Sequence, residues 1–274
     1  MRFSVTVGAV GEGRDPRGLA ELARAVEDSG WDGMFLEDYL VYQGDASRPT
    51  YDPWICLAAM AVATERIRIG TTVTPLPRRR PWKVAAEVVA LDRLSNGRMI
   101  LGVGSGDPGD PFLERHSPKV LAEMLNEGLS IIDQLWTGQP VTFRGTHYTL
   151  NDAQLTARAV QEPRVPVWVG GNMLVPAVHR RIRRWDGSCA YKRGPEGALE
   201  ITPEDVRRLR AGRGRDFDVK VSGVDPALFA EAGATWWGRW IPPLPVADTI
   251  AIVRQGPPAL WTVDNATKSG RDCR

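Results

Sequence analysis

The chain has 274 residues, of which 43% are hydrophobic and 25% charged, and its formal net charge is +2. This composition is typical of a globular protein, so we expect neither intrinsic disorder nor a nucleic-acid partner, which usually requires a basic excess. No apolar run reaches the ~18–20 residues of a membrane helix. The alternating start MRFSVTVGAV predicts a strand rather than a signal peptide. The cysteines Cys56, Cys189 and Cys273 are far apart, which argues against a disulfide scaffold and favours a cytoplasmic protein.

Strand-like apolar runs alternate with amphipathic helical patterns along the chain. The predicted strands cover residues 2–10, 32–38, 67–75, 98–106, 165–171, 186–192, 217–223 and 235–241. A helix is predicted after each of them, over residues 16–30, 54–64, 81–97, 117–138, 175–184, 202–212, 225–233 and 245–256. Alternation around Arg144-Gly145 predicts a small hairpin over 140–150, before the fifth strand.

This order of elements predicts an α/β fold. Eight strand–helix units in about 250 residues match the size of a (β/α)8 TIM barrel, and strands buried on both faces are nearly continuous apolar runs. A doubly wound open sheet is the alternative, although it usually has fewer strands. We predict one barrel domain over residues 1–258 and an irregular tail over 259–274.

The strand ends are where such barrels place their chemistry. They carry Gly, Thr, Ser and aromatic residues, whereas His116, His147 and His179 lie elsewhere, so we expect no metal site. This inventory favours a cofactor that brings its own reactivity. The glycines of GVGSGD (102–107) allow either a tight turn or close approach to a planar ring, and the turn at 170–172 favours an anion.

Charged residues near two strand ends allow two interpretations each. Neighbouring strand residues point to opposite faces, so at most one of Glu37 and Asp38 faces the barrel interior. The run Arg78-Arg79-Arg80 is by default a solvated charge run, and the alternative is a clamp on an anionic cofactor tail or substrate.

Four stretches of sequence carry a family resemblance. They are GWDGMFLED (30–38), the segment 67–107, LWTGQPVTFRGTHYTL (135–150), and RVPVWVGGN (164–172) with WDG (185–187). In this order and spacing they resemble the luciferase-like monooxygenase superfamily of flavin- or coenzyme F420-dependent oxidoreductases. The resemblance implies a planar isoalloxazine or deazaflavin ring across the carboxyl-end mouth of the barrel.

The resemblance also implies site residues. In the family, a non-prolyl cis peptide beneath the ring falls at the place of Thr72-Val73. The segment along the ring corresponds to residues 104–107, and the phosphate-binding turn corresponds to residues 170–172. The candidate cofactor-binding residues are Thr71, Thr72, Val73, Gly104, Ser105, Gly106, Asp107, Trp168, Gly170, Gly171 and Asn172. The candidate catalytic residues are Asp38, Tyr39 and Asp107.

Two departures from the family pattern shape the expected function. Tyr39 stands where many F420-dependent relatives have His, and Asp107 where they often have Glu. We therefore expect a monooxygenase or oxidoreductase that uses reduced FMN and oxygen on a small organic substrate, with a separate flavin reductase as a possible partner. The alternatives are F420-dependent hydride transfer and a non-catalytic flavin-binding barrel. The resemblance further implies a homodimer formed through helices near strands two to four.

Overall fold

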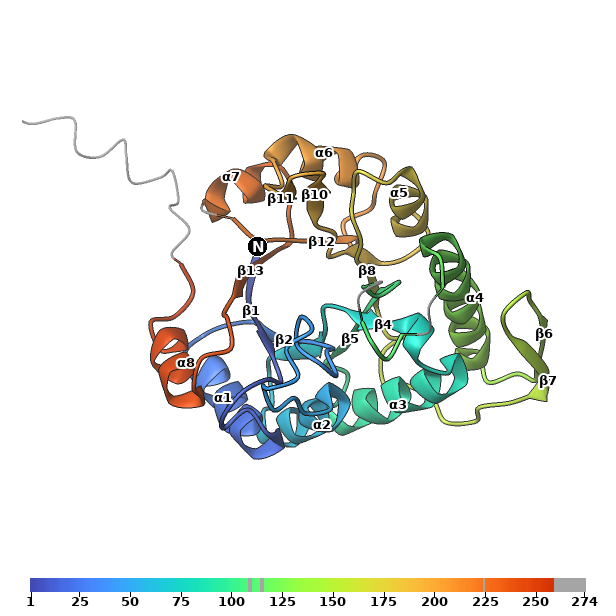
Figure 1. The fold of residues 1–274 in the computed structure, drawn as a ribbon, viewed down its shortest axis with the longest axis horizontal. Coiled ribbons are helices and arrows are strands. Elements are labelled where there is room, and N and C mark those ends of the chain that lie inside the picture. Colours follow the sequence, from blue (N-terminus) through green and yellow to red (C-terminus); the bar gives the residue numbers. More distant parts are fainter. Residues whose placement is uncertain (108–109, 114–115, 224, 259–274) are drawn as a thin grey trace, which may run out of the picture.

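A computed structural model describes residues 1–107, 110–113, 116–223 and 225–258. Within these residues, eight parallel strands form a closed ring surrounded by helices (Figure 1). The ring strands are β1 (Arg2–Gly8), β2 (Gly33–Glu37), β3 (Arg68–Thr71), β5 (Met99–Gly104), β8 (Val167–Val169), β9 (Gly187–Ser188), β12 (Asp218–Val221) and β13 (Trp236–Trp240). The ring closes where β13 pairs with β1, which confirms the predicted barrel. The tail predicted over 259–274 lies outside the described residues.

Helices connect successive ring strands and cover the outside of the barrel. They are α1 (Pro16–Asp28), α2 (Pro53–Ala63), α3 (Pro81–Leu94), α4 (Pro118–Trp136), α5 (Pro176–Ile182), α6 (Pro203–Arg210), α7 (Pro226–Glu231) and α8 (Val246–Val253). Most begin with proline, whose missing N–H costs nothing in the first turn. Asp15, Asp52 and Ser117 cap α1, α2 and α4 by accepting backbone N–H bonds. None of the described helices has the length and apolar character needed to cross a membrane.

Several short elements lie outside the eight-stranded ring. The strand β4 (Thr74–Pro75) pairs with β5 and leads into the 3-10 turn η1 (Leu76–Arg78). The antiparallel pair β6 (Val141–Arg144) and β7 (Thr149–Ala153) lies between α4 and β8, where the sequence predicts a hairpin. A second hairpin, β10 (Lys192–Gly194) with β11 (Gly197–Leu199), is not predicted by the sequence pattern because its strands are short and polar.

Aromatic side chains fill the barrel interior. Phe35, Trp168 and Trp236 pack together with ring centroids 5.2–5.7 Å apart, and Ile100 joins them. Glycine makes room for these rings, since a Cβ on Gly187 would lie 2.4 Å from the Trp168 ring. This plug gives the barrel interior an apolar centre.

Candidate active site at the barrel mouth

Val73 projects into the mouth between two ring strands. The Thr72–Val73 peptide bond is cis, as the family resemblance implies. A Cβ on Gly170 would lie 2.6 Å from Val73 Cγ1, and one on Gly104 would lie 2.8 Å from Val73 Cγ2. The two glycines at the ends of β5 and β8 therefore leave the space that the Val73 side chain occupies.

The threonines before Val73 face different surroundings. Thr71 is fully buried, and its hydroxyl donates to the Gly102 carbonyl at 2.8 Å, so it belongs to the barrel wall. The Thr72 hydroxyl is buried and has no hydrogen-bond partner among the described residues. An orphaned hydroxyl beside Val73 is the kind of group that a bound ligand satisfies.

Trp168 belongs to the aromatic plug rather than to the mouth. It is fully buried in the aromatic plug, whereas Ser105 and Gly106 are half-buried at the mouth and Asp107 is exposed there. The mouth therefore brings together Thr72, Val73 and the segment 104–107, with Thr71 and Trp168 as supporting wall and plug.

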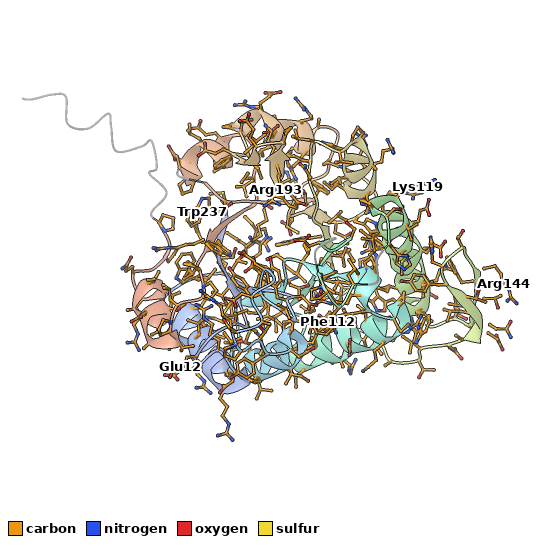
Figure 2. The ribbon with its side chains drawn as sticks, viewed as in Figure 1. Glu12, Phe112, Lys119, Arg144, Arg193 and Trp237 are labelled. Atoms are coloured by element: carbon orange, nitrogen blue, oxygen red, sulfur yellow. The ribbon has the colours of Figure 1, made fainter. Side chains whose placement is uncertain are left out.

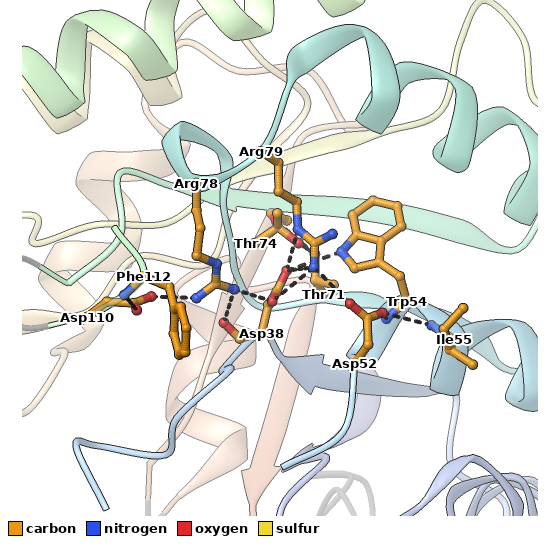
Figure 3. Close-up of polar contacts among 11 residues, drawn as sticks. Asp38, Asp52, Trp54, Ile55, Thr71, Thr74, Arg78, Arg79, Asp110 and Phe112 are labelled. Atoms are coloured by element: carbon orange, nitrogen blue, oxygen red, sulfur yellow. Dashed lines mark hydrogen bonds and ion pairs between the residues drawn. The ribbon is translucent and has the colours of Figure 1, made fainter. Parts of the chain in front are cut away.

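Asp38 is enclosed by an ion-pair network (Figure 3). Its carboxylate accepts hydrogen bonds from Arg78, from Arg79 at 3.2 and 3.3 Å, and from Trp54 Nε1 at 3.1 Å. Arg78 also pairs with Asp110, and only 4% of its side chain is exposed. This network ties the end of β2 to η1 and to Asp110.

The default interpretation of the arginine run is therefore wrong for Arg78 and Arg79, which are held in buried or half-buried ion pairs. Only Arg80 is exposed, with its guanidinium 5.8 Å from the Trp82 ring. The alternative of a free anionic clamp does not fit Arg78 either, because its charge is already matched by two carboxylates.

Glu37 is the acidic residue that faces the barrel interior, and the sequence analysis did not select it. Its carboxylate accepts a hydrogen bond from Trp240 Nε1 at 3.2 Å. Burial raises the pKa of Glu37, while the charges of Lys220 and Arg14 oppose that rise. The signal that could have found it is the alternation of β2, which places Glu37 on the same face as Phe35.

Tyr39 and Asp107 come from two loops at the mouth. Burial, aided by the charge of Glu37, raises the pKa of Tyr39 to about 12, so the phenol stays protonated at neutral pH. The Tyr39 ring packs edge-on against Tyr42 at a centroid distance of 5.2 Å. Tyr39 can therefore donate a hydrogen bond but cannot act as a base near pH 7.

The turn after β8 is tied to the β10–β11 hairpin. Asn172 Nδ2 donates to the Arg193 carbonyl at 2.7 Å, and Asn172 Oδ1 accepts from the backbone N–H groups of Arg193 and Leu174. The Arg193 charge opposes the rise in the pKa of Tyr39, so the guanidinium lies within electrostatic reach of Tyr39. Figure 2 shows Arg193 beside the central opening and Arg144 on the outer hairpin. Arg193 was also missed by the sequence analysis, because its hairpin was not predicted.

The mouth fits a flat ring system. The Val73 methyl groups and the backbone of Gly104 and Gly106 offer an apolar surface, and the orphaned Thr72 hydroxyl offers a polar contact beside it. Arg193 adds an exposed cation for an anionic tail. Within the described residues, no group of three or more His, Cys, Asp or Glu side chains could hold a metal ion.

Comparison with protein families identifies the fold family. The model of the luciferase-like monooxygenase family matches residues 1–232. The chain belongs to this family. A curated relative, an F420-dependent glucose-6-phosphate dehydrogenase from Microbacterium testaceum, is 34% identical over 223 residues, which are 76% of this chain and 64% of the relative. The chain thus spans slightly less than two thirds of that relative's length.

Solved structures share the fold of this luciferase-like protein at low sequence identity. An F420-dependent secondary alcohol dehydrogenase, solved with an F420–acetone adduct, superposes with a TM-score of 0.74 at 18% identity, covering 93% of this chain and 97% of that one. A monooxygenase from Streptomyces bottropensis gives a TM-score of 0.69 at 18% identity, with the same coverage. The structural neighbours include an F420-dependent dehydrogenase and a monooxygenase. They therefore support the barrel fold but do not distinguish between cofactors.

Proposed function

We propose that this protein is a coenzyme F420-dependent oxidoreductase that transfers a hydride between the cofactor and a small alcohol or carbonyl compound. The observation that carries the proposal is the relative from Microbacterium testaceum, which is named as F420-dependent and is 34% identical over 76% of this chain. Further relatives of the same name, from Amycolatopsis mediterranei and Kineococcus radiotolerans, support the same cofactor. The expected use of reduced FMN and oxygen becomes the second candidate.

In this proposal the mouth residues hold the deazaflavin. Val73, the backbone of 104–106 and Gly170 would hold the ring, and the Thr72 hydroxyl would be available to bond it. Arg193 attracts the acidic tail of F420. The bound deazaflavin supplies a two-electron hydride acceptor or donor.

The protein's own residues position the substrate. The aromatic plug of Phe35, Trp168 and Trp236 closes the barrel beneath the mouth, so substrate and water can approach only from the carboxyl side. Tyr39 stays protonated and can donate a hydrogen bond to a substrate oxygen. The Asp38–Arg78 ion pair holds the loop that carries Tyr39.

We also propose a homodimer, as the family resemblance implies. Ile55 and Val62 on α2 and Leu94 on α3 are exposed apolar side chains next to the predicted contact region. Their burial between two copies would remove apolar surface from water. Sedimentation velocity of the wild-type protein and of Val62→Asp tests this, because the variant should shift a dimer toward monomer, and a monomeric wild type would contradict it.

Anaerobic turnover tests the proposed function. Purified protein is mixed with oxidised F420 and a panel of alcohols that includes glucose 6-phosphate, and loss of the deazaflavin absorbance is followed. We expect reduction of F420 with at least one alcohol.

Parallel reactions contain a flavin reductase, FMN, NADPH and oxygen. Substrate oxygenation in these reactions, with no F420 reduction, would support the monooxygenase candidate. Binding of F420 or FMN without turnover of any substrate would support the alternative of a non-catalytic flavin-binding barrel.

A further inference from the structure

Glu37 and Lys220 lie inside the barrel, near enough for the charge of each to affect the pKa of the other. Glu37 ends β2, Lys220 lies on β12, and β1 and β13 stand between these strands in the ring. Glu37 accepts the Trp240 indole N–H at 3.2 Å, and Lys220 Nζ is hydrogen-bonded to the Thr6 hydroxyl, also at 3.2 Å. The aromatic plug lies next to Lys220, whose Nζ is 5.9 Å from the Phe35 ring centroid.

The glycine at position 238 creates the space for the amine. A Cβ on Gly238 would lie 2.6 Å from Lys220 Nζ, so any other residue at this place in β13 would displace the lysine. Lys220 is therefore directed into the barrel by the absence of a side chain on the neighbouring strand. Its ammonium is bonded to a hydroxyl rather than to a carboxylate, which leaves donor capacity for a ligand oxygen.

The surroundings tune both groups toward neutrality. Burial raises the pKa of Glu37 and lowers the pKa of Lys220. The other titratable groups around them are Arg14 and Tyr42 near Glu37, Tyr39 at the mouth, and Cys189 beside Lys220. Tyr39 and Cys189 have pKa values of about 12, so both stay protonated at neutral pH.

Other candidate bases near the mouth are less suited to proton transfer. Asp38 is enclosed by Arg78 and Arg79, and Tyr39 holds its proton near pH 7. Glu37 is the carboxylate that combines a position inside the barrel with a single indole hydrogen bond. A carboxylate accepts a proton most effectively when its pKa is raised toward the working pH.

We propose that Glu37 and Lys220 form the subsite for the reacting oxygen of an alcohol or carbonyl substrate, an inference that rests on the proposed function and deepens it. Lys220 donates a hydrogen bond to the substrate oxygen, and Glu37 exchanges the substrate proton. In oxidation, the O–H proton passes to the Glu37 carboxylate and the O–H electron pair forms the C=O bond. The carbinol C–H pair leaves as a hydride to oxidised F420. The products are a carbonyl compound, protonated Glu37 and reduced F420.

A titration without cofactor tests the pairing of the two groups. In ¹⁵N-labelled protein, the Trp240 indole signal, assigned with Trp240→Phe, reports the ionisation of Glu37. We expect a transition above the ordinary glutamate pKa of 4.5. It should disappear in Glu37→Gln and move to higher pH in Lys220→Met, because the ammonium favours the charged carboxylate. Glu21→Gln, an exposed change on α1, should leave it unaltered. A transition at pH 4.5 would show that the pKa of Glu37 is not raised, and a transition unchanged in Lys220→Met would show that Lys220 does not act on Glu37. Either result would overturn the inference.

Turnover and cofactor binding test the catalytic role. With the best alcohol from the panel, Glu37→Gln should lower kcat about 100-fold and remove the acidic limb of the pH profile. The F420 dissociation constant should stay within about twofold, since Glu37 acts on the substrate. A Glu37→Gln variant with near wild-type kcat would overturn the inference. If the wild type fails to bind F420, the proposed function fails instead, and the indole titration still decides whether Glu37 and Lys220 are coupled.

Discussion

Glu37 and Asp38 are adjacent in the chain, but their carboxylates have separate surroundings. Glu37 faces the barrel interior and accepts the Trp240 indole N–H, whereas Asp38 is buried against Arg78, Arg79 and Trp54. At the end of β2, the Glu37 carboxylate therefore lies at the mouth, whereas the Asp38 carboxylate belongs to the ion-pair network that holds the loops together. Substitutions at the two positions should therefore have different effects.

Asp38→Asn should destabilise the protein strongly. The substitution removes the shared carboxylate of a buried network and leaves Arg78 paired with Asp110 alone and Arg79 with the more exposed Asp52, and breaking such a buried pair costs about 3–5 kcal/mol. Asp45→Asn removes a carboxylate from a half-exposed pair with Arg48, so it should cost less than about 1 kcal/mol. Urea unfolding measures both free energies of unfolding, and similar values for the two variants would contradict the framework role of Asp38.

Gly170→Ala should destabilise the barrel through Val73. The new Cβ would lie 2.6 Å from Val73 Cγ1, an overpacking that costs about 1–3 kcal/mol. Adding Val73→Ala should recover part of this loss, and a double-mutant cycle measures the coupling. Gly214→Ala, which adds its Cβ to open space, is the matched control. Additive effects of Gly170→Ala and Val73→Ala would show that the two residues do not constrain each other.

Much of the fold follows from local sequence signals, and the site follows from them less completely. All eight ring strands and their helices overlap the predicted ranges, because apolar runs, proline starts and glycine ends mark them. The sixth strand is shorter than predicted, since only Gly187–Ser188 pair with the ring. Lys192 belongs instead to β10, whose polar hairpin has no apolar pattern to reveal it.

The site residues depend on contacts between distant segments, which one sequence does not reveal. Asp38 and Arg78 are 40 positions apart, and Glu37 and Trp240 are 203 apart. Alternation along β2 puts Glu37 on the same face as Phe35, but the sequence alone does not show which face of β2 the barrel encloses, because the pairing of β2 with β1 decides it. The hairpin that carries Arg193 is anchored to the turn after β8 by Asn172 and by backbone hydrogen bonds of Tyr191 with Gly171 and Met173.

Glu37→Gln should stabilise the protein at neutral pH. Because the native pKa of Glu37 is raised above 4.5, the folded state binds this proton more tightly than the unfolded state. The stability that wild type draws from this group is present below pH 4.5 and is lost as pH rises through the native pKa. The variant should therefore be more stable than the wild type at pH 7 and have a higher Tm there, and this difference should shrink as the pH falls below 4.5. Thermal unfolding of both proteins from pH 4 to pH 8 measures the difference, and a variant less stable at pH 7 would contradict it.

Arg193→Ala should weaken F420 binding more than FMN binding. The exposed guanidinium near the mouth attracts the longer acidic tail, so its loss should raise the F420 dissociation constant about 3–10-fold at low salt. Added salt should reduce the difference between wild type and variant. Arg144→Ala removes an exposed arginine from the outer hairpin and should leave binding unchanged. Equal effects of the two substitutions would remove Arg193 from the site.

Equilibrium binding of F420 and FMN to the purified protein tests the central claim most directly. Each cofactor is titrated separately, and quenching of the tryptophan fluorescence is followed, since the chain has ten tryptophans. The account predicts a micromolar or tighter dissociation constant for F420 and binding of FMN at least about tenfold weaker. Tighter binding of FMN than of F420, or no binding of F420, would contradict it.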